Sequence, residues 1–306
     1  MTGTNIEIEA ERSMSWLDAL ILGIVEGITE FLPVSSTGHL DLTNAVLQLD
    51  GRAVDAYAIV IQFGAILAVV ALYKQRAYEI LQGFLGKLRP TEHLLGKNEQ
   101  GFHLGMKLGV AFIPIGIAGL TLADFIGENL RNPVPVSVAL ILGGIVMIGV
   151  EQFVVKPRAR RNGGFRGGSL KEVDDMTYFD AIFIGVAQCF ALWPGTSRAM
   201  ATIVGAQLRG FSSVGAAEVS FLLALPTITA AAGYEMVMAR EALLEELGWG
   251  IVIFGNLVAF GVAYLAVKWF INIVTRYGMT PFGIYRIFLG GVFLWLGLRG
   301  ALTFVE

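Results

Sequence analysis

The sequence predicts an all-α, polytopic membrane protein. Of its 306 residues, 55% are hydrophobic and only 15% are charged, and the mean hydropathy is +0.66. Soluble domains usually carry about 25% charged residues. Apolar runs long enough to cross about 30 Å of hydrocarbon recur along the chain. A third observation refines the class: four apolar runs are too short to span, and they occur as two pairs, each broken at a proline.

The hydropathy pattern gives ten apolar segments. Segments 16–32 and 36–48 form one pair around Pro33, and segments 178–193 and 197–208 form another around Pro194. Proline ends a helix at or just before itself, and a following Ser or Thr is a good N-cap. We therefore expect two re-entrant hairpins, each entering and leaving by the same face. The other six segments are expected to span the membrane: 55–73, 104–123, 135–155, 217–237, 249–271 and 282–302.

Similarity between the two halves of the chain predicts an inverted repeat. "GIVEGITEFLPVSST" in the first pair echoes "GVAQCFALWPGTSR" in the second, with one residue deleted before the proline. Each pair precedes three spanning segments, and because three is odd the second half would be inverted relative to the first. Chance similarity of two apolar segments is the alternative, but the shared positions fall in register. Residues 1–306 would then form one integral membrane domain, with repeats at about 16–155 and 178–302.

Loop charge predicts the orientation in the membrane. Two loops expected on one face, 74–103 and 156–177, hold half of the 22 Lys and Arg residues, and Arg209 and Arg276 are expected on the same face. Cytoplasmic loops carry an excess of Lys and Arg, so this face is expected to be cytoplasmic, with both termini outside. The first hairpin would then enter from outside. The sequence has no basic tail that would indicate binding to nucleic acid. Its polar, acidic start lacks the basic region of a signal peptide. The single cysteine, Cys189, excludes an intrachain disulfide.

Two carboxylates lie within the first short pair. Glu26 and Glu30 are four residues apart, so they share one helix face. Like charges in a low dielectric repel unless a cation lies between them or one is protonated. Carboxylate oxygens suit a hard divalent cation such as Mg²⁺ or Ca²⁺. A pair that is merely hydrogen-bonded to neighbouring helices is the alternative, but the cost of charge in a membrane favours a functional pair and a metal site.

The start of the second segment is a candidate catalytic site. Ser35 and Ser36 follow Pro33 where a helix begins, and a helix start offers free N–H groups and a favourable dipole to an anion. Plain N-capping explains one serine, and the other could be a nucleophile or a donor to phosphate. His39 can share a face with Ser36 and act as a general base, a proton donor or a nucleophile. Thr37 is a further candidate for binding the substrate.

The second pair offers a matching helix start. Gly195, Thr196 and Ser197 bring small side chains and free N–H groups, and Arg198 adds a permanent cation that matches phosphate bidentately. An arginine that snorkels to the interface is the alternative. Gln188 takes the place that Glu26 has in the first repeat. A lipid pyrophosphate with a divalent cation would satisfy both the polar groups and the apolar wall around them.

At these residues the chain resembles the undecaprenyl-pyrophosphate phosphatase family, also called bacitracin-resistance proteins. The similarity runs over nearly the whole chain. The resemblance implies hydrolysis of undecaprenyl pyrophosphate in the bacterial cytoplasmic membrane, which recycles the lipid carrier for peptidoglycan and confers tolerance to bacitracin. It also implies a divalent cation, an E-x-x-x-E motif at Glu26 and Glu30, and catalytic roles for Ser36, His39 and Arg198. The segments that carry it are "GIVEGITEFLPVSSTGHL", "VIQFGAILAVVAL", "DDMTYFDAIFIGVAQCFALWPGTSR", "AAEVSFLLALP" and "PFGIYRIFLG".

The chain departs from the family pattern at two places. The family usually reads PG-x-SRSG, whereas Ala199 and Met200 follow the arginine here. Many members carry an acid just before the "VIQ" stretch, where this chain has Ala58, with Asp55 a turn earlier. The arginine remains, so we expect the activity to be retained.

A transporter is the rival function, because inverted repeats with broken helices are common in transporters. It would flip the lipid monophosphate instead of, or as well as, hydrolysing the pyrophosphate. A transporter would need charge compensation but no nucleophile, so Ser36 and His39 beside the glutamates favour an enzyme. The acid-phosphatase class of lipid phosphatases lacks support, since its K-x₆-R-P motif is not found. The active site is expected to open to the outer face. The nucleophile, the preferred metal and the oligomeric state, a homodimer included, stay open.

Overall fold

The structure, a computed structural model, describes residues 13–88, 99–161 and 170–300. Six helices in this part of the chain are long and apolar enough to cross a membrane, as the sequence predicts. The expected N-terminal tail before residue 13, the loop residues Arg89, Lys97 and Arg166, and the last two residues of segment 282–302 lie outside the described residues. The six are Arg52–Leu72, Glu99–Leu122, Pro133–Arg160, Ser213–Met238, Arg240–Tyr277 and Thr280–Leu298.

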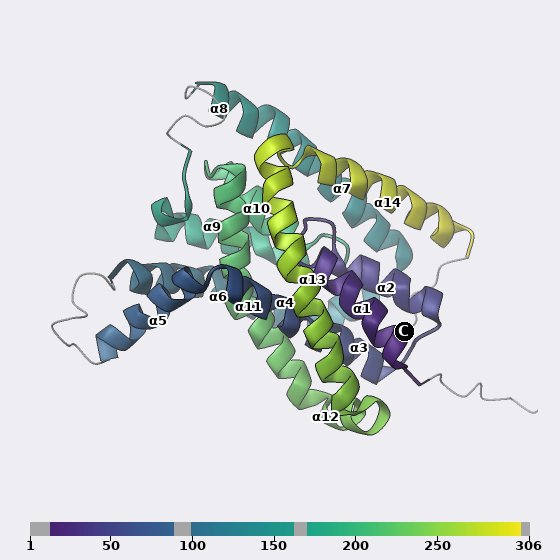
Figure 1. The fold of residues 1–306 in the computed structure, drawn as a ribbon. Coiled ribbons are helices and arrows are strands. Elements are labelled where there is room, and N and C mark those ends of the chain that lie inside the picture. The colour runs from purple at the N-terminus through teal and green to yellow at the C-terminus, as the bar shows by residue number, and fades with distance from the viewer. Residues whose placement is uncertain (1–12, 89–98, 162–169, 301–306) are drawn as a thin grey trace, which may run out of the picture.

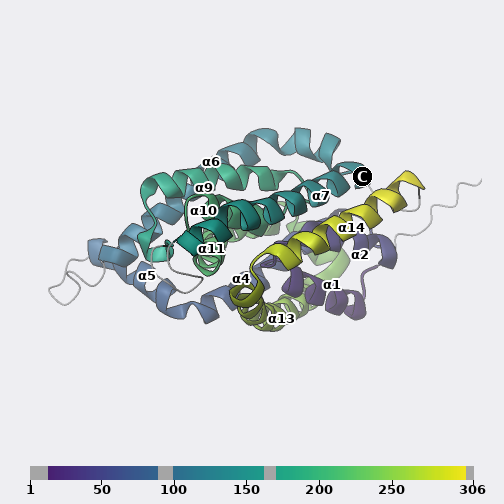
Figure 2. The ribbon, with the colours of Figure 1, turned by 90° about the horizontal axis from the view of Figure 1, so that it is seen from above.

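Figure 1 shows the arrangement of the helices, and Figure 2 shows the same helices from above. Three of the spans are interrupted: one at Ile61, between α3 and α4, one at a π-helical turn, Glu151–Val155, between α7 and α8, and one at a second π-helical turn, Leu243–Leu247, between α12 and α13. The helices are α1 (Trp16–Thr29), α2 (Ser36–Leu47), α3 (Arg52–Val60), α4 (Gln62–Leu72), α5 (Lys74–Leu88), α6 (Glu99–Leu130), α7 (Pro133–Val150), α8 (Lys156–Arg161), α9 (Tyr178–Cys189), α10 (Arg198–Leu208), α11 (Ser213–Met238), α12 (Arg240–Ala242), α13 (Gly248–Tyr277) and α14 (Thr280–Leu298).

The first short pair is α1 and α2, and the turn between them contains Pro33. A capping box starts α1: the Ser15 hydroxyl and the Asp18 carboxylate each accept a hydrogen bond from the other's backbone N–H. Ser35 is the N-cap of α2, and its Oγ accepts a hydrogen bond from the Gly38 N–H at 3.4 Å. Ser35 has a φ of +77°, a backbone conformation that residues other than glycine rarely adopt. Backbone strain of this kind clusters at functional sites.

The second short pair, α9 and α10, repeats these local features. A capping box of Thr177 and Asp180 starts α9, and Ser197, with a φ of +72°, is the N-cap of α10. The Ser197 Oγ accepts a hydrogen bond from the Met200 N–H at 3.3 Å. Twenty residues separate the first cap from the second in both pairs, so the deletion before Pro194 is made up after it.

Each short pair packs against a long helix from the other half of the chain. Helix α1 lies along α13, and α9 lies along α6. Glycines allow both approaches: a Cβ on Gly23 or Gly27 would meet the backbone or side chains of α13, and one on Gly185 would meet the Ala111 carbonyl of α6. Helices α7 and α14 run side by side in both views (Figures 1 and 2).

Ion pairs mark the two ends of α11. At its N-terminal end Arg76 pairs with Asp174 at 2.8 Å and with Glu218 at 3.4 Å, so the two basic loops expected on one face do meet there. At its C-terminal end Glu235 pairs with Arg52 of α3. Because α11 is a candidate span, these two groups of charges lie at opposite ends of the molecule.

Candidate active site

A polar cavity of about 120 Å³ lies where the two proline-containing turns meet. The first turn and the start of α2 supply carboxylate and hydroxyl groups, and the second turn and the start of α10 supply the facing wall. Most of the residues that the sequence singles out therefore come together. The lining consists of Glu30, Ser35, Ser36, Thr37, Gln62, Ala191, Pro194, Gly195, Ser197, Arg198, Thr227, Ile228 and Ala231.

Glu30 connects a hydroxyl and a cation inside this cavity. The Ser36 Oγ donates a hydrogen bond to Glu30 Oε2 at 2.5 Å, and the Arg198 Nη2 donates one to Glu30 Oε1 at 3.0 Å. Arg198 also donates from Nη1 to the Ser220 carbonyl at 3.2 Å, while its Nε has no hydrogen-bond partner within the described residues. A serine hydroxyl bonded to a carboxylate, with a guanidinium beside that carboxylate, is suited to attack on a phosphate.

Glu26 lies one turn before Glu30 and is fully buried. Neither of its carboxylate oxygens has a hydrogen-bond partner among the described residues. A buried carboxylate in this state needs a proton or a cation. In the part of the chain described, no group of three or more His, Cys, Asp or Glu side chains could hold a metal by itself. The glutamate pair therefore fits a divalent cation whose other ligands come from phosphate, backbone or water oxygens.

Arg286 of α14 joins the two turns. It is fully buried, and its guanidinium donates to the Pro33 carbonyl at 3.1 Å and to the Gly195 carbonyl at 2.9 Å. It also donates to the carbonyls of Ala139 and Leu140 on α7. No role was predicted for Arg286 from the sequence, although it is a charged residue within the apolar segment "PFGIYRIFLG".

His39 faces away from the polar cavity. Its Nδ1 lies 2.7 Å from the Ser35 carbonyl oxygen and its Nε2 lies 2.7 Å from the Tyr285 hydroxyl, with the two rings stacked. Because a carbonyl only accepts, Nδ1 is the donor, and a neutral imidazole then accepts from Tyr285 at Nε2. His39 lines an apolar groove of about 450 Å³ between α1, α13 and α14.

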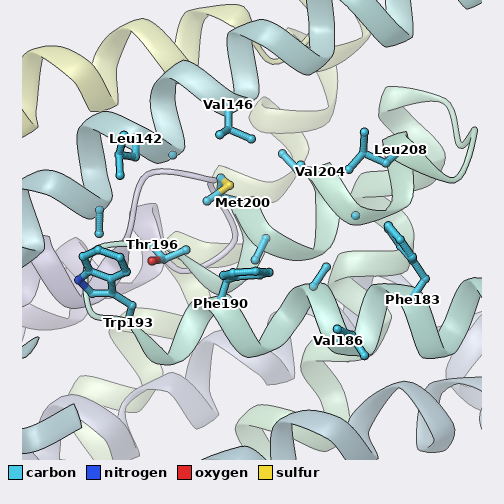
Figure 3. A pocket seen from close by; sticks show the side chains of 15 residues that line it. Leu142, Val146, Phe183, Val186, Phe190, Trp193, Thr196, Met200, Val204 and Leu208 are labelled. Carbon is cyan, nitrogen blue, oxygen red and sulfur yellow. The ribbon is translucent and has the colours of Figure 1, made fainter. Parts of the chain in front are cut away.

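Thr196 and Gln188 also lie outside the lining of the polar cavity. Thr196 lines a second apolar groove (Figure 3). Gln188 is fully buried behind the cavity, and its Oε1 accepts a hydrogen bond from the hydroxyl of Thr227 at 3.3 Å. Thr227 and Gln62 line the cavity without having been predicted. Each is a polar residue within an apolar run, which is the signal that could have found them.

The two departures from the family pattern lie outside this cavity. Ala199 is fully buried, and Met200 lines the second apolar groove. Asp55 pairs with Arg131 at 2.7 Å and does not line the polar cavity. A replacement of a serine at position 199 therefore removes no hydroxyl from the lining of this cavity.

Comparison with known proteins agrees with the resemblance seen in the sequence. Residues 19–292 match the family described as bacitracin resistance protein BacA. The undecaprenyl-diphosphatase of Sorangium cellulosum is 45% identical over 92% of this chain and 87% of its own length. Undecaprenyl-diphosphatase 2 of Rhodospirillum rubrum and the undecaprenyl-diphosphatase of Persephonella marina are each 43% identical over 92% of this chain, and over 96% and 98% of their own lengths. A match of this extent shows that the chain belongs to the BacA family of bacitracin resistance proteins.

Proposed function

We propose that this protein hydrolyses undecaprenyl diphosphate to undecaprenyl phosphate and inorganic phosphate in the bacterial cytoplasmic membrane. The observation that carries the proposal is the contact of Ser36 and Arg198 with the same carboxylate, Glu30, between the two turns. Ser36 and Glu30 from the first turn and Arg198 from the distant second turn thus present a nucleophile, a base and a cation in one buried cavity. The names of the relatives identify the lipid diphosphate as the substrate.

Ser36 is the nucleophile that the geometry favours. Its Oγ attacks the terminal phosphorus while Glu30 accepts the hydroxyl proton. The bond between that phosphorus and the bridging oxygen breaks, and undecaprenyl phosphate leaves. Water then hydrolyses the phosphoserine, which releases inorganic phosphate and restores Ser36. His39, the other candidate, lines a different groove and would have to reorient before it could act.

Arg198 and the helix starts bind the charge that the reaction develops. The Arg198 guanidinium lines the cavity beside Glu30, and Ser35 and Ser197 are the N-caps of the two helices that begin there. Glu26 and Glu30 are the residues that would hold a divalent cation, Mg²⁺ or Ca²⁺. Such a cation would neutralise diphosphate charge and would supply the partner that the Glu26 carboxylate lacks.

The two short pairs are re-entrant hairpins in an inverted repeat, in this proposal. The capping boxes at the starts of α1 and α9 match, and so do the strained serines at the starts of α2 and α10. The packing matches as well: α1 lies along α13 of the second half, and α9 lies along α6, the corresponding helix of the first half. The repeats are about 16–155 and 178–302.

The cavity opens toward the outer face of the membrane, in this proposal. Thr227, Ile228 and Ala231, which line it, lie in the C-terminal half of α11, away from the basic end where Arg76 meets Glu218. If the basic end is cytoplasmic, the substrate headgroup enters from outside.

Phosphate release by the purified protein in detergent tests the proposal. Undecaprenyl diphosphate would be supplied with Mg²⁺, with Ca²⁺ and with a chelator, and Leu257→Ala on the exposed face of α13 would serve as a control. We expect metal-dependent release from the wild type and the control. Absence of release under every condition, together with transfer of undecaprenyl phosphate across liposome membranes, would favour the transporter function instead.

A further inference from the structure

An apolar groove with a volume of about 540 Å³ lies beside the polar cavity. Leu142 and Val146 of α7 form one wall, and Phe183, Val186 and Phe190 form the other (Figure 3). Helix α10 forms the floor. We propose that this groove holds the prenyl chain of the lipid diphosphate; the inference rests on the function proposed above.

One turn of the chain serves both the groove and the polar cavity. Gly195 and Ser197 line the polar cavity, whereas Thr196, between them, lines the groove. A diphosphate held at Gly195 and Ser197 therefore lies beside the end of the groove marked by Thr196 and Trp193 in Figure 3. The polar side chains of the groove, Thr196 and Trp193, are at this end, where a headgroup would join its tail.

The groove has length and access suited to part of a long chain. It follows α10 from Met200 to Leu208, about 12 Å at the rise of an α-helix, and continues past the start of α10 to Thr196, which is room for part of a prenyl chain. Leu142, Val146 and Phe190 are 49%, 46% and 70% exposed, so the groove opens sideways between helices that would face lipid. A chain in the bilayer could then enter laterally, without leaving an apolar environment.

The groove beside His39 is the alternative site for the same chain. It is smaller, about 450 Å³, and Val34 occupies the position in its turn that Thr196 has in the larger groove. His39 and Tyr285 in this groove are already paired, because His39 bonds to both the Tyr285 hydroxyl and the Ser35 carbonyl. The larger groove is therefore the better continuation of the diphosphate site.

Filling the groove tests the assignment. Val146→Trp would project an indole into it from an exposed position, Ile28→Trp would do the same in the smaller groove, and Leu257→Trp would lie outside both. The substrates would be undecaprenyl diphosphate and a five-carbon prenyl diphosphate too short to reach Val146. Thermal unfolding in detergent would establish that each variant is folded.

We expect Val146→Trp to raise KM for undecaprenyl diphosphate about tenfold or more, since several buried CH₂ groups would lose their contacts, and to change hydrolysis of the short substrate less than about twofold. The other two variants should match the wild type. Equal losses on both substrates, no loss on either, or a chain-length effect only in Ile28→Trp would overturn the assignment.

A binding measurement separates this inference from the proposed reaction. Undecaprenyl phosphate carrying a benzophenone on its tail would be photo-cross-linked to the protein, and labelled peptides would be mapped. Labelling of α7, α9 and α10 that unlabelled undecaprenyl phosphate removes would support the assignment, even if the wild type hydrolysed neither diphosphate and the proposed function failed. Labelling elsewhere, or labelling here that phosphatidylglycerol removes equally well, would show an ordinary lipid site and overturn it.

Discussion

Arg198 and Glu30 form an ion pair at 3.0 Å that joins the second half of the chain to the first. Both side chains are almost buried, with 12% and 6% exposed. Glu30 uses its other oxygen to accept a hydrogen bond from Ser36, so the ion pair also fixes the hydroxyl proposed as the nucleophile. Because Ser36 and Arg198 both bond to the carboxylate of Glu30, a substitution at any of these three residues tests the same arrangement.

Replacing the guanidinium should impair catalysis more than folding. We expect Arg198→Lys to lower kcat by about 10²-fold to 10³-fold, because an ammonium cannot bond to Glu30, to the Ser220 carbonyl and to phosphate in the same geometry. Phosphate release from undecaprenyl diphosphate measures the effect, with Arg276→Lys, an exposed cation, as the matched control. Turnover near that of the wild type would exclude Arg198 from the reaction.

Removing the hydroxyl of Ser36 tests whether this residue is the nucleophile. Ser36→Ala should lower turnover by at least about 10³-fold, since no other side-chain hydroxyl among the described residues donates a hydrogen bond to Glu30. His39→Gln should have a smaller effect, because His39 bonds to Tyr285 and lines a different groove. A phosphorylated Ser36 trapped by acid quench would establish the covalent step. If His39→Gln abolished turnover while Ser36→Ala kept it, the assignment of the nucleophile would be reversed.

Arg286 is expected to hold the two turns in place. Arg286→Met leaves carbonyls of Pro33, Gly195, Ala139 and Leu140 without their donor, at about 1–3 kcal/mol for each that finds no substitute. We therefore expect a large fall in the thermal unfolding temperature together with loss of activity. Arg286→Lys should recover part of both. Arg299→Met, at an exposed position, is the control, and an unfolding temperature unchanged in Arg286→Met would contradict this role.

Glu26 should affect the dependence on metal rather than the fold. Glu26→Gln removes a buried charge whose oxygens lack partners in the described part of the chain, so the variant should fold at least as well as the wild type. We expect the concentration of Mg²⁺ needed for half-maximal activity to rise about tenfold or more, because one oxygen ligand is weakened. The test is a Mg²⁺ titration of phosphate release. An unchanged titration curve would place the cation elsewhere.

Asp180, outside the six spans, predicts a pH dependence of stability. Burial alone would raise its pKa, but hydrogen bonds from Lys171, Thr177 and Arg209 lower it from 3.8 to about 2. A lowered pKa stabilises the folded state by about 2 kcal/mol above pH 4, and the contribution is lost as the pH falls from 4 toward 2. The unfolding temperature of Asp180→Asn should therefore lie below that of the wild type at pH 7, with the difference shrinking below pH 4. A difference independent of pH would refute this.

The sequence predicted the six spanning helices and the two short pairs because hydrophobic run length and proline act locally. It also predicted that Glu30, Ser36 and Arg198 belong to one site, because a charge in an apolar segment needs a partner. The direction of His39 was not predictable from spacing. Its place three residues after Ser36 suggested a shared face, but Tyr285, which fixes the ring, is 246 residues away.

The role of Arg286 and the side of the turn on which Thr196 lies could not be predicted for the same reason. Arg286 acts through four backbone carbonyls, and no side-chain pattern encodes such partners. Thr196, Gly195 and Ser197 are neighbours in sequence, yet the backbone at Ser197, with its φ of +72°, belongs to a turn that separates them between two cavities. The turn propensity of these residues does not decide which of them faces which cavity. The packing of α7 against the turn decides it.

The packing of each short pair against the opposite half also sets the order in which the molecule can mature. Helix α1 is among the first to be synthesised, but α13, along which it lies, and α14, which carries Arg286, are the last. During synthesis Glu26 of α1 and Glu30 at its C-terminal end therefore lie in the membrane before the helices that pack against them in the final structure have been made. The catalytic centre would be completed only when the C-terminal helices insert, so a ribosome stalled before α13 would hold a chain that contains Glu30, Ser36 and Arg198 but has no activity.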